Sequence, residues 1–126
     1  MPEKIKQTFT TSEMDGAKSY DDASPREGLK FDQGKDPWDL APWDSFRAVV
    51  KVLALGAKKY APRNWEDGMA WSRLYASTMR HLTAWWEGED NDPEMGHSHL
   101  WNAGTCIMFL IAYEISGVGK DDRPGR

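Results

Sequence analysis

The chain has few of the residues that form covalent cross-links or closed metal sites. Its 126 residues include one cysteine, Cys106, and three histidines. One cysteine excludes an internal disulfide and a cysteine-based zinc site, and so few histidines make a closed structural zinc site hard to complete. A reducing compartment, the cytoplasm, is therefore the expected location.

Long apolar runs are also missing. The longest, Cys106 to Tyr113, is far shorter than the ~20 residues of a membrane-spanning helix. The first ten residues, MPEKIKQTFT, lack the apolar segment of a secretory signal. No membrane partner is expected.

An excess of positive charge is missing as well. Lys and Arg number 16 and Asp and Glu number 20, which gives a formal net charge of −4 and a pI of about 5.3. Such a chain repels a polyanion on average, so we expect no stable nucleic-acid partner. Its length suffices for one compact domain.

The strict alternation of apolar and polar residues that is typical of strands is nearly absent. Three segments instead repeat their apolar residues with the period of a helix, so the expected fold class is all-α, a compact helical bundle. The predicted helices span residues 42–59, 70–87 and 98–116. An irregular N-terminal arm (1–28) precedes this helical domain (29–116), and a flexible tail (117–126) follows it.

The third predicted helix is apolar on nearly all sides. A domain this small can hardly bury such a helix by itself, so we expect a homo-dimer or homo-tetramer.

The connection between the second and third helices is acidic. Residues 87–94, EGEDNDPE, carry five carboxylates in eight positions. Carboxylates this close repel one another unless cations lie among them, and oxygen ligands suit hard divalent metals. His81 and His99 flank the segment, each on the apolar side of its helix. We predict a divalent metal site here, with a merely solvated acidic turn as the alternative.

Two other connections place cations near aromatic rings. Lysine and arginine can hold phosphate oxygens, asparagine can contact a base edge, and an indole can stack on a base. The residues concerned are Lys30, Lys35 and Trp38 in the first connection and Lys58, Arg63, Asn64 and Trp65 in the second. The alternative for Trp65 is that it anchors its loop on the core. Neither connection matches a P-loop or a dinucleotide fingerprint. Acids, cations and rings together indicate a metal-bound polyphosphate attached to a nucleobase.

Taken in order, residues 30–113 resemble the phage branch of the all-α, MazG-like nucleoside triphosphate pyrophosphohydrolases, the dATP/dGTP diphosphohydrolases of MazZ type. The strongest pieces are GAKKY at 56–60, NW at 64–65, RH at 80–81, and GE…D.E at 88–94 followed by His99. The resemblance implies a helical dimer or tetramer that binds two or more Mg²⁺ or Mn²⁺ ions. It also implies hydrolysis of a purine dNTP to dNMP and pyrophosphate in the host cytoplasm, for phages that replace adenine with 2-aminoadenine.

From these residues we expect a specific division of roles. The expected metal ligands are Glu89, Asp92, Glu94 and His99. Glu89 and Asp92 are also expected to be catalytic, together with His81, which would orient a ligand or accept a proton from water. The candidate substrate contacts are Lys30, Lys35, Trp38, Lys58, Arg63, Asn64, Trp65 and Arg80. Two alternatives stay open: a pyrophosphatase for dCTP or dUTP, and a non-catalytic oligomeric module that binds single-stranded DNA or nucleotides.

Overall fold

A computed structural model of the chain describes residues 28–126. Of these, residues 42–126 form one compact unit, and residues 28–41 belong to another. The described part of the smaller unit holds one short 3-10 helix, η2 (Trp38–Leu40). The predicted irregular arm, apart from Gly28, lies outside the described residues.

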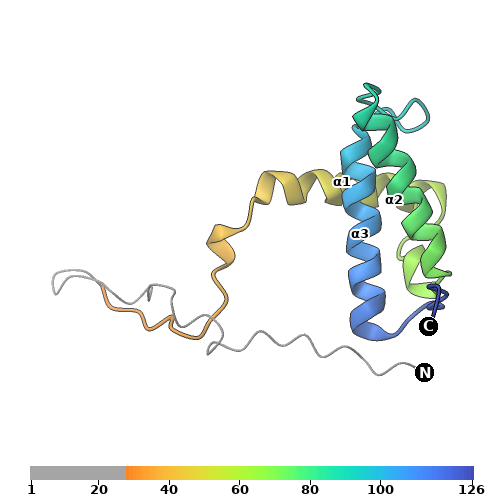
Figure 1. Cartoon of the computed structure of the whole chain (residues 1–126). Helices are drawn as coiled ribbons and strands as arrows, with labels where there is room; N and C mark the ends of the chain where they lie inside the picture. Colours follow the sequence, from red (N-terminus) through yellow and green to blue (C-terminus); the bar gives the residue numbers. More distant parts are fainter. Residues whose placement is uncertain (1–27) are drawn as a thin grey trace. The chain divides into compact units, whose positions relative to one another are not determined.

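The larger unit is helical, as predicted (Figure 1). Its elements are α1 (Trp43–Lys59), the short 3-10 helix η3 (Asn64–Asp67), α2 (Trp71–Trp86) and α3 (His99–Ser116). Within the described residues the only β-type pairing is two isolated bridges. Each long helix starts and ends within one residue of its predicted bounds, which confirms the all-α class.

Local signals at the two ends of α3 explain why its bounds could be predicted accurately. Ser98 precedes the helix, and its side-chain oxygen accepts a hydrogen bond from the backbone N–H of Leu100 at 3.1 Å. Gly117 follows the helix in the left-handed conformation, with φ of 77°, and its N–H donates to the Tyr113 carbonyl. Both residue types are typical of these positions, so the bounds could be read from the sequence.

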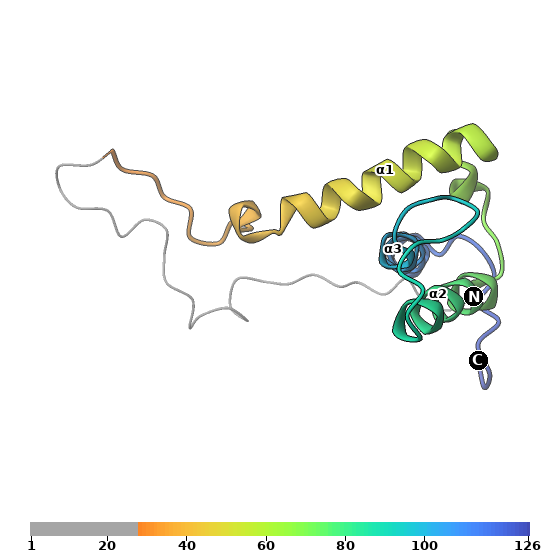
Figure 2. The same ribbon diagram turned by 90° about the horizontal axis from the view of Figure 1, so that it is seen from above.

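Helix α3 is the centre of the larger unit. It runs antiparallel to α2, and α1 crosses it on the side away from α2 (Figure 2). Trp71, Leu74 and Tyr113 form the buried core between α2 and α3, with partly buried apolar side chains around them. The core therefore lies toward the start of α2 and the end of α3, while the opposite end of this helix pair carries the acidic connection. No helix among the described residues is long and apolar enough to cross a membrane.

The segment after α3 contacts the start of α2. The Lys120 carbonyl accepts a hydrogen bond from the backbone N–H of Trp71 at 2.9 Å, and the Asp122 carboxylate accepts one from the backbone N–H of Ser72 at 2.9 Å. Asp122 thereby caps α2, whose own N-cap residue, Ala70, has no side-chain acceptor. The sequence predicts a flexible tail at 117–126; within this segment Lys120 and Asp122 contact the first turn of α2, whose N–H groups have no partner inside the helix.

Candidate metal centre

The acidic connection between α2 and α3 folds back on itself. The N–H of Asp92 donates to the His97 carbonyl at 2.8 Å, and the N–H of Gly96 donates to the Asp92 carbonyl at 2.7 Å. Gly96 has φ of 82°, a value that suits glycine in such a turn. The turn directs Asp92 inward, and its residue is only 9% exposed.

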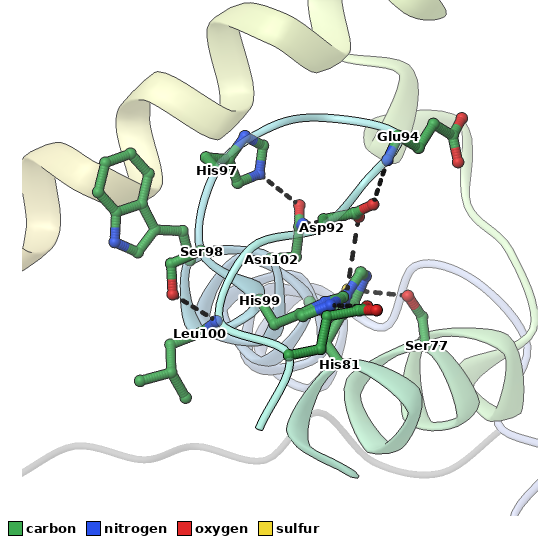
Figure 3. A network of polar contacts seen from close by, with 12 residues as sticks. Ser77, His81, Asp92, Glu94, His97, Ser98, His99, Leu100 and Asn102 are labelled. Atoms are coloured by element: carbon green, nitrogen blue, oxygen red, sulfur yellow. Dashed lines mark hydrogen bonds and ion pairs between the residues drawn. The ribbon is translucent and has the colours of Figure 1, made fainter. Parts of the chain in front are cut away.

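Three potential metal ligands converge at this end of the helix pair (Figure 3). They are His81 on α2, Asp92 in the connection and His99 at the start of α3, here called the His–Asp cluster. One donor atom from each lies within 4.8 Å of the other two. The Nδ1 atoms of His81 and His99 are 2.9 Å apart, and His81 Nδ1 lies 4.0 Å from Asp92 Oδ2.

Hydrogen bonds orient two members of the His–Asp cluster. His99 Nε2 donates to the Glu89 carboxylate at 2.7 Å, which leaves the Nδ1 lone pair of His99 directed at His81. Asp92 accepts hydrogen bonds from Asn102 Nδ2 at 3.2 Å and from the backbone N–H of Glu94 at 2.8 Å. The ring and the carboxylate are therefore held in place from outside the cluster.

A third histidine, His97, helps to hold Asp92 in place through Asn102. Because Asn102 donates its amide N–H to Asp92, its oxygen must accept from His97 Nε2, at 2.9 Å. The His97 ring stacks on Trp101, with 5.8 Å between ring centroids. His97 Nδ1 is buried and has no hydrogen-bond partner among the described residues. His97 and Asn102 had no predicted role; their spacing relative to His99, two residues before and three after, was the only signal.

Burial keeps His81 neutral. It lowers the pKa of the imidazole below its ordinary value of 6.5, and the attraction of Asp92, which acts in the opposite direction, only partly offsets this. A neutral imidazole has a free lone pair, which is the form that binds metals. Two imidazole nitrogens and one carboxylate oxygen at this spacing fit a divalent cation, and further hydrogen bonds hold two of the three side chains, His99 and Asp92.

The structure separates the four residues expected to be metal ligands. Asp92 and His99 are in the His–Asp cluster. Glu89 lies next to the cluster, where its carboxylate accepts a hydrogen bond from His99. The Glu94 carboxylate instead forms an ion pair with Lys59 at the end of α1. In Figure 3 the Glu94 side chain extends away from the cluster. His81, expected to act beside the metal, contributes a donor atom to the cluster itself.

The candidate substrate contacts fall in several places. Lys58 ends α1 and is exposed, as are Arg63 and Asn64 in the turn before α2 and Arg80 on α2. Trp65 packs into the core, stacked on Phe109 with 5.4 Å between centroids, and so corresponds to the anchoring alternative. The remaining three, Lys30, Lys35 and Trp38, belong to the smaller unit.

The fold and the cluster define a small helical protein with a candidate metal centre at the junction of an antiparallel helix pair. A family model described as "dATP/dGTP diphosphohydrolase, N-terminal" matches residues 25–123, which include all three long helices and the cluster. The chain belongs to this family, which confirms the resemblance drawn from its motifs.

A relative from Salmonella phage PMBT28, named dATP/dGTP diphosphohydrolase, is 35% identical over 96 residues. The match covers 76% of this chain and 33% of the relative, so the chain spans about a third of the relative's length. No solved structure matches the chain.

Proposed function

We propose that the chain is a metal-dependent pyrophosphohydrolase that converts dATP or dGTP to the deoxynucleoside monophosphate and pyrophosphate. The His–Asp cluster carries this proposal, because its three side chains could hold a divalent cation and lie within the residues that match the family. The name of the phage relative supports the purine substrate. The cofactor would be Mg²⁺ or Mn²⁺.

Each part of the site has a role in this chemistry. A divalent cation held by His81, Asp92 and His99 would neutralise phosphate charge and make a water molecule more acidic. The water oxygen attacks the α-phosphorus, the bond to the α–β bridging oxygen breaks, and pyrophosphate leaves. The carboxylate of Glu89 borders the cluster and is half exposed, so it can accept the proton that the water loses.

At least one cation contacts the acidic connection. Lys59 contacts Glu94 in that connection, and Lys58 and Arg63 are exposed nearby in the sequence. They are suited to compensate the charge of the leaving pyrophosphate. Lys59 therefore joins the residues expected from the sequence, and its pKa is raised by the hydrogen bond to Glu94.

The surface of α3 supports the expected homo-oligomer. Leu100, Ile107, Ile111 and Ile115 are each 40% or more exposed, although they belong to the helix that is apolar on nearly all sides. A second copy of the chain would cover this surface. Light scattering on the purified chain would then report a dimer or tetramer. In a phage, such an enzyme would act in the host cytoplasm, removing dATP where 2-aminoadenine replaces adenine.

The direct test is to incubate the chain with each dNTP and Mn²⁺ or Mg²⁺ and to identify the products by mass. We expect dAMP, dGMP and pyrophosphate. Glu89→Gln should abolish pyrophosphate release and keep the fold, whereas the exposed Glu87→Gln should retain turnover. Undiminished turnover in Glu89→Gln would contradict the assignment, and products from dCTP or dUTP alone would favour the pyrimidine alternative.

A second candidate is a binding module without turnover of its own. The match covers 33% of the phage relative, so the relative's printed name describes a longer protein than the matched segment. Nucleotide binding with intact dNTPs as the sole recovered species would support this candidate and refute the first.

A further inference from the structure

We propose that the His–Asp cluster selects a first-row transition-metal ion such as Mn²⁺ or Co²⁺ over Mg²⁺, and that it binds this ion through the Nδ1 atoms of both histidines. This inference rests on the metal dependence in the proposed function and specifies the metal.

The donor atoms in the cluster favour such an ion. Two of the three are imidazole nitrogens, from His81 and His99, and one is a carboxylate oxygen of Asp92. Imidazole nitrogen binds Co²⁺, and to a smaller extent Mn²⁺, more readily than it binds Mg²⁺, which prefers six oxygen ligands and usually binds through carboxylates and water. Nitrogen-rich coordination therefore disfavours Mg²⁺.

The other carboxylates of the acidic connection do not restore an oxygen-rich site. The Glu94 carboxylate is paired with Lys59, and the Glu89 carboxylate accepts a hydrogen bond from His99 Nε2. The segment is oxygen-rich in sequence, but its fold brings a single carboxylate, that of Asp92, into the His–Asp cluster.

The spacing of the two nitrogens also fits. A cation about 2.1 Å from each of two nitrogens holds them about 3.0 Å apart at adjacent corners of an octahedron, and about 3.4 Å apart in a tetrahedron. The Nδ1 atoms of His81 and His99 are 2.9 Å apart, which matches the octahedral spacing. His81 Nδ1 lies 4.0 Å from Asp92 Oδ2, and one donor atom from each of the three residues lies within 4.8 Å of the other two, so the carboxylate could join the two nitrogens around one cation.

The hydrogen bonds around the cluster prepare His99 for Nδ1 ligation. Glu89 holds the His99 hydrogen on Nε2, so the Nδ1 lone pair is already directed at the centre. Without a cation, His81 Nδ1 donates its hydrogen to that lone pair. Ligation of a cation through Nδ1 of His81 would require the hydrogen of this ring to be on Nε2 instead, a tautomer that is also neutral.

The test uses the full chain, freed of metal. Calorimetric titration with Mn²⁺, Co²⁺ and Mg²⁺ should show the two transition metals binding at least about 10-fold more tightly than Mg²⁺. Pulsed electron paramagnetic resonance of the Mn²⁺ form should show ¹⁴N couplings from two imidazoles. Equal affinity for Mg²⁺, or no nitrogen coupling, would overturn the proposal and leave the two histidines as a hydrogen-bonded pair.

Variants locate the ligands. His81→Phe keeps a ring and should remove one of the two nitrogen couplings. Asp92→Asn should weaken Mn²⁺ binding at least about 10-fold, whereas Asp90→Asn, the same change at an exposed neighbour, should leave it unaltered. Equal losses in the two Asp→Asn variants would show general electrostatic attraction instead of a defined site. The wild-type spectrum decides the question even if a variant fails to fold.

The outcomes also separate this inference from the proposed function. Nitrogen-coordinated Mn²⁺ without nucleotide turnover would refute the pyrophosphohydrolase and support the metal assignment. Turnover driven by Mg²⁺, with no nitrogen coupling to Mn²⁺, would support the pyrophosphohydrolase and refute the metal assignment.

Discussion

Replacing Tyr113 with phenylalanine tests how the core holds the loop before α2. Tyr113 is fully buried, with an exposed fraction of 0%, and its hydroxyl donates to the Trp65 carbonyl at 2.6 Å. Burial raises the pKa of the hydroxyl above its ordinary value of 10, so it stays protonated and able to donate. Tyr113→Phe removes this donor and leaves the ring in place.

The magnitude follows from the carbonyl left behind. This carbonyl keeps a second partner, the N–H of Gly68 at 3.1 Å, so the change removes one hydrogen bond and destabilises the native state by about 0.5–1.5 kcal/mol. In a domain of this size, 1 kcal/mol lowers the midpoint of thermal unfolding by about 4–8 °C. The loop that carries Arg63 and Asn64 is tied to the core through Trp65, so trypsin should also cleave after Arg63 sooner.

The assay is urea and thermal unfolding followed by circular dichroism, with limited trypsin digestion in parallel. Tyr75→Phe is the matched control, because Tyr75 is 62% exposed and its change should alter the free energy of unfolding by less than about 0.5 kcal/mol. Equal destabilisation by the two changes would refute the reasoning, since it would mean that the buried hydrogen bond contributes nothing.

Three further predictions concern the site and the C-terminal segment. Asn102→Leu removes a donor to Asp92 and should weaken Mn²⁺ binding about 10- to 100-fold by calorimetry; unchanged affinity would show that Asp92 needs no such support. Hydrogen bonds from α2 lower the pKa of Asp122 below 3.8, so this carboxylate stabilises the fold above about pH 4. That contribution is lost as the pH falls further, and Asp122→Asn should flatten this part of the stability–pH curve. A Cβ at Gly119 would lie 2.5 Å from a backbone oxygen, so Gly119→Ala should destabilise by more than about 1 kcal/mol in urea. Gly125→Ala, at a similar φ but with no atom within 4 Å, should destabilise less.

The sequence was sufficient for the helices and for the neighbourhood of the site. Helix bounds depend on the spacing of consecutive residues and on end signals such as Ser98 and Gly117, which are local. The acidic segment with His81 and His99 on either side indicated the region where the three residues of the His–Asp cluster meet. Motif order was also enough to indicate the family.

Local pattern could not assign the individual ligands. Glu94 looked equivalent to Asp92 in the acidic segment, yet its carboxylate pairs with Lys59, a residue 35 positions away. The same limit applies to Trp65, whose indole was as suitable for a base as for the core until its contact with Phe109 was known.

Sequence alone therefore determined the helical class, the helix bounds, the family and the segment that holds the candidate site. Tertiary structure decided which of many polar groups meet: His81 and His99 are 18 positions apart and touch only because α2 and α3 pack side by side. The physical reason is one of range. Helix formation depends on neighbours within a few residues, whereas a metal centre depends on distances of a few ångströms between groups that the chain separates by whole elements.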